Sequence, residues 1–282
     1  MLVFNNKADL GTYLKPFWVK TKSIGFVPTM GALHQGHLSL LDTAAKNNTI
    51  TVISIFVNPT QFNNPEDLVK YPRTLEADIQ KIEKLNPNVI VYAPEVADLY
   101  TPNEKAAPFS FDGLEFQMEG KFRPGHFDGV GTVVKKLFEI VQPTNAYFGE
   151  KDFQQLQIVK KLVSKYKIPV NIVPCPIHRE ANGLAMSSRN ERLSDTERKD
   201  AALIYNTLQQ AKLKFGTKSA KEVSDWVTKV FQNHQTFSLE YFEIADETSL
   251  KTCLRKSKNK KYRAFIAVFV NNIRLIDTIS LN

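Results

Sequence analysis

The sequence predicts an α/β fold, with a parallel sheet in residues 1–176 and a smaller α+β domain in residues 177–282. Five short apolar runs alternate with helical patterns in the first part, which is typical of βαβ units and a parallel sheet. In the second part, two amphipathic helices precede two or three strands. The chain has 282 residues and is 43% hydrophobic and 23% charged, which is the composition of a globular protein that buries a sizeable core.

The expected strands of the first part are short and rich in β-branched residues. Residues 50–57 are apolar on both faces, as in a strand buried within a parallel sheet. A weak helical pattern over residues 9–20 contains Pro16, which predicts a kink or an early end there. The other expected strands are 24–28, 88–93, 146–148 and 170–173, and the other expected helices begin near residue 36 or cover 75–85, 129–141 and 153–166.

Two further segments complete the expected organisation. Residues 94–128 are rich in proline and glycine, and we expect loops with short helical pieces that form a lid. In the C-terminal part the expected helices are 194–215, opened by a capping box at Ser194, and 220–234. The expected strands there are 239–245, 263–270 and 273–279, with a hairpin turn at Asn271-Asn272.

The charge and cysteine content limit the partners and the compartment. A formal net charge of +8 favours anionic ligands, either a nucleic acid or a polyphosphate substrate. The basic run at 255–263 is expected to be a solvated loop, and we expect no nucleic-acid partner because Tyr262 alone gives too little aromatic interleaving. We expect no membrane association, since no apolar stretch reaches about 18 residues. Cys175 and Cys253 indicate reduced thiols in a cytoplasmic protein.

The motif PTMGALHQGH, residues 28–37, combines the end of a strand, a tight turn and the start of a helix. Unpaired N–H groups and the helix dipole make such a turn a seat for phosphate. His34 and His37 are three residues apart and therefore share one side of the first helical turn. Two alternatives are ordinary surface polarity and a metal pair, although zinc needs a third protein ligand and none is suitably placed. The dinucleotide GxGxxG and GxxxxGK(S/T) motifs are absent after the first expected strand.

Further polar residues follow other strands of the predicted parallel sheet. The carboxyl ends of parallel strands meet at one edge, so His34, Asn58, Gln61 and Lys151 are expected to converge there. Lys151 near a transferring phosphorus would offset developing negative charge, whereas its plainer interpretation is a solvated surface lysine. Gln61 and Gln155 would serve a small polar substrate, and the plainer interpretation is loop polarity.

The segment Met186-Ser187-Ser188-Arg189 follows a glycine and offers two hydroxyls and a guanidinium. These groups suit the β- and γ-phosphates of a nucleotide, because arginine binds phosphate with a planar fork. Taken alone, the same residues favour a simpler interpretation, in which they form a helix cap followed by a surface arginine. Both interpretations remain open on the sequence alone.

These motifs together resemble the pantothenate synthetases, the AMP-forming pantoate–β-alanine ligases. The resemblance covers nearly the whole chain in five blocks, PTMGALHQGH, FVNPTQF, RPGHFDG, YFGEKDFQQL and GLAMSSRN. It implies a Rossmann-like sheet of the HxGH nucleotidyltransferase type with residues 1–176 binding ATP and pantoate, a C-terminal lid domain and a homodimer. It also implies a reaction in which Mg-ATP activates (R)-pantoate as pantoyl adenylate, and the amine of β-alanine then displaces AMP to give pantothenate.

The resemblance also implies roles for individual residues. His37, His34, Lys151 and Arg189 would be catalytic, with a proton-donor role for His37, and Mg²⁺ would be carried by ATP rather than by protein side chains. Gln61, Gln155 and Asn58 would bind pantoate and β-alanine. ATP would be held by Met30, Gly31, Ala32, Leu33, His34, Gln35, Gly36, His37, Gly149, Glu150, Lys151, Asp152, His178, Met186, Ser187, Ser188 and Arg189. His178 departs from the family pattern, in which a small aliphatic residue is more usual beside adenine.

Two other functions compete with this hypothesis. One is a related enzyme that transfers the adenylyl group and keeps AMP in its product. The other is an RNA-binding protein, suggested by the positive charge and by the HxGH motif. Neither accounts for Gln61, Gln155 and the RPGHFDG block together.

Overall fold

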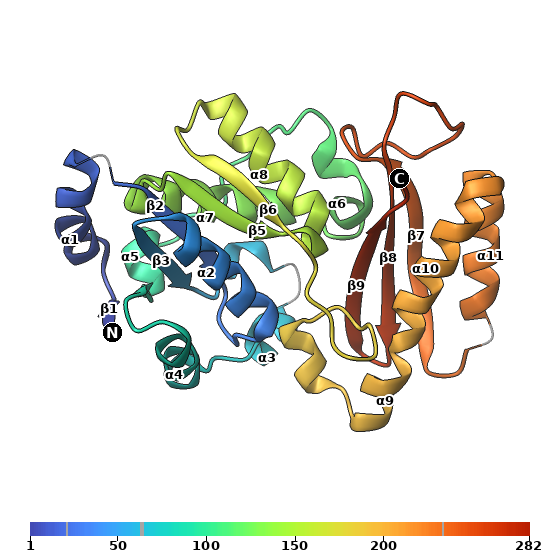
Figure 1. Ribbon diagram of the computed structural model, residues 1–282, viewed down its shortest axis with the longest axis horizontal. Helices are drawn as coiled ribbons and strands as arrows, with labels where there is room; N and C mark the ends of the chain where they lie inside the picture. The colour runs from blue at the N-terminus through green and yellow to red at the C-terminus, as the bar shows by residue number, and fades with distance from the viewer. Residues whose placement is uncertain (21, 63–64, 233) are drawn as a thin grey trace. The chain divides into compact units, whose positions relative to one another are not determined.

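The computed structural model describes residues 1–20, 22–62, 65–232 and 234–282, which form two compact units (Figure 1). Unit 1 comprises Met1–Glu115, Gly120–Gly149 and Gln155–Cys175, and unit 2 comprises Phe116–Glu119, Glu150–Gln154 and Pro176–Asn282. The sequence suggested a single domain boundary after residue 176. It therefore did not predict that Phe116–Glu119 and Glu150–Gln154 belong to unit 2. Among the described residues, no helix is both long and apolar enough to span a membrane.

Unit 1 contains a parallel sheet, as predicted. Within the described residues it has six strands in the order β1-β4-β3-β2-β5-β6. The strands are β1 (Leu2–Phe4), β2 (Ile24–Thr29), β3 (Ile50–Ile55), β4 (Ile90–Tyr92), β5 (Asn145–Gly149) and β6 (Asn171–Cys175). The sequence predicted five of them and missed β1, which pairs with β4 at the sheet edge. The apolar run of β1 ends at Phe4, before two asparagines, whereas the equally short β4 lies within the longer apolar run 89–93.

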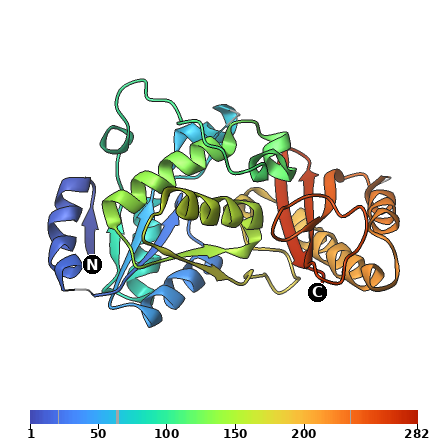
Figure 2. The same ribbon diagram turned by 90° about the horizontal axis from the view of Figure 1, so that it is seen from above.

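Helices cover both faces of this sheet. Helices α2 (Gln35–Asn47) and α7 (His126–Val141) both contact β2, and Figure 2 shows them on opposite sides of the sheet. The prediction of an early end at Pro16 is wrong, because α1 (Lys7–Val19) continues past it. The remaining helical segments that lie wholly in unit 1 are η1 (Pro59–Gln61), α3 (Pro65–Lys70), α4 (Leu75–Leu85) and α5 (Val96–Leu99). Three others are shared with unit 2: η2 (Leu114–Phe116) ends there, and α6 (Met118–Phe122) and α8 (Phe153–Tyr166) begin there.

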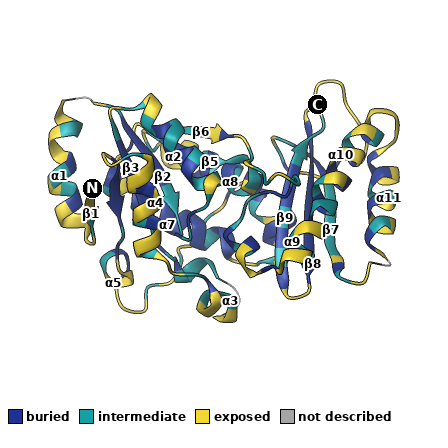
Figure 3. Ribbon diagram, turned by 60° about the horizontal axis from the view of Figure 1, so that its bottom comes forward, coloured by how far each residue is buried: buried dark blue, intermediate teal, exposed yellow. Residues whose placement is uncertain are grey.

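The core of unit 1 lies between the sheet and these helices. Its largest fully buried side chains include Tyr92, Phe26, Phe111 and Phe138. Figure 3 shows the strands largely in the buried colour and the outward faces of α1 and α4 as exposed. Apolar burial of this kind stabilises a fold by about 25 cal/mol per Å² of surface removed from water.

Unit 2 is built on a sheet of three antiparallel strands, in the order β7-β8-β9 among the described residues. These are β7 (Phe237–Asp246), β8 (Tyr262–Val270) and β9 (Ile273–Ser280). The predicted hairpin turn at Asn271-Asn272 is confirmed, because Val270 pairs with Ile273 across it. The predicted helix 194–215 is divided at Ala201 into α9 (Asp195–Asp200) and α10 (Ala202–Thr217), and α11 (Ala220–Gln232) follows.

One partly buried ionic cluster joins the short segment 116–119 to the sheet of unit 2. The guanidinium of Arg274 on β9 donates to both carboxylate oxygens of Glu119, at 2.7 and 2.8 Å, and also binds Glu240. The hydroxyl of Tyr241 donates to Glu119 at 2.7 Å. A bulge between Leu239 and Tyr241 lets Glu240 contribute to the same cluster. Residues 255–261 of the basic run are exposed, as expected of a solvated loop. The prediction is wrong for Tyr262 and Arg263 at its end, because they begin β8 and are buried.

Two helix caps of unit 2 lead to a prediction of how the stability of the fold changes at acidic pH. Bonds from the backbone N–H and hydroxyl of Ser194 lower the pKa of Glu197, and Ser219 does the same for Glu222. A carboxylate whose folded pKa lies below its unfolded value of 4.5 stabilises the fold above that pH and loses this contribution as pH falls further. We therefore expect the double variant E197Q/E222Q to melt below the wild type at pH 7, and the difference to shrink as the pH falls below 4.5. Calorimetric Tm values across this range test it, and a constant difference would contradict it.

Candidate active site

The loop between β2 and α2 carries the HxGH motif, and its backbone is held from within the protein. Gly31 and Ala32 have positive φ angles of 82° and 48°. Ala32 N donates to Asp78 Oδ2 at 2.9 Å, and Leu33 N donates to Asp78 Oδ1 at 2.7 Å. Asp78 lies on α4 and is fully buried, and the ammonium of Lys81 donates to Leu33 O at 2.7 Å. The prediction that the N–H groups of this turn are unpaired is therefore wrong for Ala32 and Leu33.

The two histidines are arranged as paired donors. Their ring centroids lie 4.0 Å apart, so His34 and His37 do share one side of the first turn of α2. Nδ1 of His34 accepts from Gly36 N at 3.1 Å, and Nδ1 of His37 accepts from His34 N at 3.4 Å. Because a backbone N–H can only donate, both neutral rings carry their proton on Nε2. In this tautomer each imidazole carries one N–H donor, on Nε2.

The turn η1 follows β3 and meets the HxGH loop. Nε2 of Gln61 contacts Sδ of Met30 at 2.9 Å, which joins the loops after β2 and β3. Asn58 is 1% exposed and caps η1, and its amide binds Gln61 Oε1 at 3.1 Å. The expected convergence of loops at the carboxyl edge of the sheet is confirmed for these two loops.

The RPGHFDG block packs directly on η1. Nδ1 of His126 lies 2.8 Å from Gln61 O, and Gly129 O accepts from the amide of Asn58 at 3.2 Å. A Cβ on Gly129 would lie 2.4 Å from Thr60 O, so only glycine permits this approach of α7 to the turn. The block is thus a support for η1, a role that the sequence did not assign.

In unit 2, the segment that bears Lys151 is anchored to the three-stranded sheet. Lys151 lies in η3 (Glu150–Asp152), its side chain is 18% exposed, and its ammonium is 3.6 Å from Asp152. The buried Arg263 of β8 pairs with Glu150 at 3.2 Å and stacks on the ring of Phe153 at 4.0 Å. Residues on both sides of Lys151 are therefore fixed by one arginine.

The loop that contains Ser187 and Arg189 is fixed by a second arginine of unit 2. Arg179 binds Asp277 through two bonds of 2.6 and 3.0 Å and donates to Gly183 O at 3.1 Å. Ser187 caps η4 (Ser188–Arg192) by accepting from Arg189 N at 3.3 Å, so the capping interpretation of this motif is observed. The exposed His178 accepts at its carbonyl oxygen from Met186 N at 3.0 Å.

The other predicted site residues are distributed over both units. Gln155 lies partly exposed in the first turn of α8 in unit 1, after Gly149 at the end of β5. Gln35 and Gly36 open α2. Throughout the part of the chain that the structure describes, no three His, Cys, Asp or Glu residues are grouped as a metal site. Imidazole, ammonium and guanidinium groups are also poor ligands for Mg²⁺, which prefers oxygen.

Four residues that matter for this geometry were missed. Asp78 had a visible signal, since it lies one helical turn from Ile82 and so places a carboxylate on the apolar face of the predicted helix 75–85. Tyr100, Lys81 and Arg263 had none, because their partners are distant in sequence.

Comparison with known proteins identifies the family. The pantoate-beta-alanine ligase family matches residues 2–280. The chain belongs to this family. The pantothenate synthetase of Flavobacterium psychrophilum is 69% identical over 281 residues and that of Christiangramia forsetii is 55% identical over 282 residues, each match covering 100% of both chains. The resemblance inferred from the five motifs is confirmed.

Two solved structures support the same assignment. The pantothenate synthetase of Thermus thermophilus is 36% identical, with a TM-score of 0.91, and the match covers 100% of this chain and 99% of that one. The pantoate-beta-alanine ligase of Francisella tularensis, described as complexed with beta-gamma ATP and beta-alanine, is 36% identical with a TM-score of 0.82 and coverages of 100% and 98%. The chain is accordingly an ATP-using enzyme of this ligase family, which makes a carbon–nitrogen bond between pantoate and β-alanine.

Proposed function

We propose that the reaction proceeds in two half-reactions through pantoyl adenylate. The carboxylate of (R)-pantoate attacks the α-phosphorus of ATP, a carboxylate–phosphorus bond forms and pyrophosphate leaves. The amine of β-alanine then attacks the acyl carbon, the carbon–nitrogen bond forms, AMP leaves and the amine loses a proton. The observation that carries this proposal is the pair of imidazole Nε2–H donors at the start of α2, joined through Met30 to the amide of Gln61.

Within unit 1, the histidine pair would bind the phosphates and stabilise the leaving pyrophosphate. Donors held rigidly before the reaction stabilise developing charge more than mobile water does. His37 would donate a hydrogen bond from Nε2–H to the leaving group, and His34 would support it. The proton-donor role that the family resemblance implies for His37 would require its imidazolium form. Gln61 and Gln155 would bind pantoate, with Asn58 acting through its bond to Gln61. Pantoate needs no general base, because its carboxylate is already ionised at neutral pH.

Within unit 2, the family resemblance assigns the cationic and hydroxyl groups to ATP. Lys151 is fixed by its anchored neighbours, and Ser187, Ser188 and Arg189 lie together at the start of η4. Glu150, Asp152, His178 and Met186 are assigned to ATP on the strength of the family resemblance. Mg²⁺ carried on the phosphates of ATP supplies additional neutralisation of charge. No step is assigned to a protein-bound metal.

We also propose that the chain forms a homodimer and acts in the cytoplasm. The family resemblance supports the dimer, and light scattering should give a mass twice that of the 32.0 kDa chain. Use of ATP and the two cysteine thiols, Cys175 and Cys253, which form no disulfide, support the cytoplasmic location. A monomeric mass at micromolar concentration would contradict the dimer.

The decisive experiment measures pyrophosphate release from Mg-ATP by the purified protein. With pantoate alone we expect a stoichiometric burst, and addition of β-alanine should convert the burst into steady turnover. Pyrophosphate release that requires β-alanine from the start would contradict a separate adenylate intermediate. AMP retained in the isolated product would instead favour the adenylyl-transferring alternative.

A further inference from the structure

We propose that Tyr100 is a positioning residue that acts through Asn58 and holds the Gln61 amide with its NH₂ group toward pantoate. This inference rests on the proposed role of Gln61 as a pantoate ligand. Tyr100 is 6% exposed and follows α5 in unit 1. It is outside every motif that carries the family resemblance.

The orientation of the Asn58 amide is fixed by backbone groups that cannot exchange roles. Thr60 N, which can only donate, lies 3.4 Å from Asn58 Oδ1, and Thr60 Oγ1 donates to the same oxygen at 3.1 Å. Gly129 O, which can only accept, lies 3.2 Å from Asn58 Nδ2. Reversing the amide would place its NH₂ group against the backbone donor and its oxygen against the backbone acceptor. The oxygen of Asn58 therefore faces Tyr100 and its nitrogen faces Gln61.

This orientation determines the orientation of the next amide. Asn58 Nδ2 must donate to its partner on Gln61, so the atom 3.1 Å away is an acceptor, Oε1. The NH₂ group of Gln61 is consequently directed the other way, where it contacts the sulfur of Met30 in the ATP-binding loop. The thioether sulfur of Met30 is only a weak hydrogen-bond acceptor. The NH₂ group of Gln61 would therefore bind an oxygen acceptor of a substrate more strongly. A carboxylate or hydroxyl oxygen of pantoate fits that requirement.

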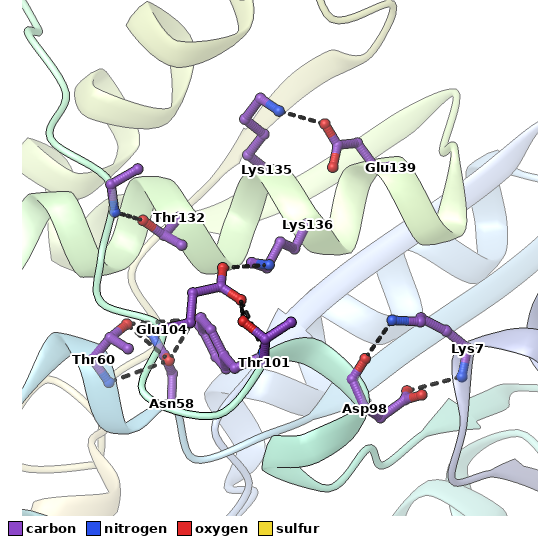
Figure 4. Close-up of polar contacts among 12 residues, drawn as sticks. Lys7, Asn58, Thr60, Asp98, Thr101, Glu104, Thr132, Lys135, Lys136 and Glu139 are labelled. Carbon is purple, nitrogen blue, oxygen red and sulfur yellow. Dashed lines mark hydrogen bonds and ion pairs between the residues drawn. The ribbon is translucent and has the colours of Figure 1, made fainter.

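Tyr100 supplies the shortest hydrogen bond that holds Asn58. Its hydroxyl donates to Asn58 Oδ1 at 2.8 Å, and burial raises the pKa of Tyr100, so the phenol remains a donor throughout the working pH range. The ammonium of Lys136 lies 5.1 Å from the centre of the tyrosine ring and is held by Glu104 at 2.8 Å. Figure 4 shows Glu104 between Lys136 and Thr101, close to the Asn58–Thr60 contacts. The tyrosine is thus held through its ring as well as through its hydroxyl bond.

The test compares two tyrosines of unit 1 that each lose only a hydroxyl. Tyr100→Phe should raise the KM for pantoate about tenfold, the effect of losing about 1.4 kcal/mol of hydrogen bonding, and leave the KM for ATP unchanged. Tyr92→Phe is the matched control, because Tyr92 is also buried but donates to Asp98 at 2.6 Å, away from Gln61. It should lower the Tm and leave the KM for pantoate unchanged.

Two variants of Gln61 show whether Tyr100 acts through it. In the Gln61→Ala background, Tyr100→Phe should add no further increase to the KM for pantoate. Gln61→Glu should bind pantoate more weakly than Gln61→Ala does, because it places a carboxylate where the NH₂ group is expected. Two outcomes would overturn the inference. One is an equal increase in the KM for pantoate from Tyr100→Phe in both backgrounds, and the other is an equal increase in the KM values for pantoate and ATP together with the Tm loss of the control. If Gln61→Ala leaves the KM for pantoate unchanged, the proposed role of Gln61 itself is wrong.

Discussion

Replacing Lys151 by alanine is expected to slow adenylate formation about 100-fold or more, which is the scale of losing one preorganised donor at a reacting group. The lysine is held for this role, because Arg263 fixes Glu150 before it and Phe153 after it. Its own ion pair with Asp152 is long, at 3.6 Å, and contributes little to the stability of the fold. Single-turnover release of pyrophosphate from ATP and pantoate is the direct measurement.

The matched control is Lys221→Ala in the same unit. Lys221 forms an exposed ion pair with Asp225 on α11, so the same chemical change occurs there without a proposed role in the reaction. We expect this control to keep the wild-type rate and both variants to keep nearly the wild-type Tm. A folded Lys151→Ala protein that releases pyrophosphate at the normal rate would show that the lysine has no part in adenylation.

The second large effect is expected at Asp78, which no substrate is proposed to contact. Asp78→Asn keeps the volume of the side chain but leaves one oxygen where two N–H donors, Ala32 N and Leu33 N, now bind. A buried donor without a partner costs about 1–3 kcal/mol. Part of this cost should appear as a lower Tm, and part as about a tenfold or greater rise in the KM for ATP, because the histidines follow directly in the same loop.

Asp42→Asn serves as the control for this prediction. Asp42 lies on α2, close in sequence to the same histidines, and pairs only at the surface with Lys46. Removing its charge should change neither the Tm nor the KM for ATP appreciably. If Asp78→Asn lowers the Tm but leaves the KM for ATP at the wild-type value, Asp78 stabilises the fold without shaping the loop.

Much of the fold was predictable because buried positions recur at regular spacings and are occupied by apolar residues. Residues 50–57 were recognisable as a central parallel strand, and β3 is indeed surrounded by β2 and β4. The edge strand β1 was missed because its apolar run ends at Phe4, whereas β4, which also has three residues, lies within the longer apolar run 89–93. The division at Ala201 was missed for another reason, since α9 and α10 are separated by a single residue that has helical φ and ψ angles.

The candidate site was predictable only in part. His34, Gln61 and Lys151 follow strands, and the topology of a parallel sheet brings such positions to one edge. The groups that hold them are distant in sequence, as Asp78, Tyr100 and Arg263 show, and nothing in one chain links them to their partners before folding. The HxGH turn illustrates the difference, because its glycine pattern predicted a phosphate seat but did not show that a buried aspartate occupies two of its N–H groups. The lid role of residues 177–282 stays a prediction.

The partly buried cluster around Arg274 limits where the coding sequence could be divided into fragments that fold. A fragment that begins at residue 176 would retain Arg274 and Glu240 but lack Glu119, and it would also lack the 150–154 segment that Arg263 holds. In such a fragment Arg274 would keep Glu240 and Arg263 would keep Glu247, but each arginine would lose the second carboxylate of its cluster. Recombination at that boundary would therefore preserve the full set of ion pairs only between parents that share both internal segments.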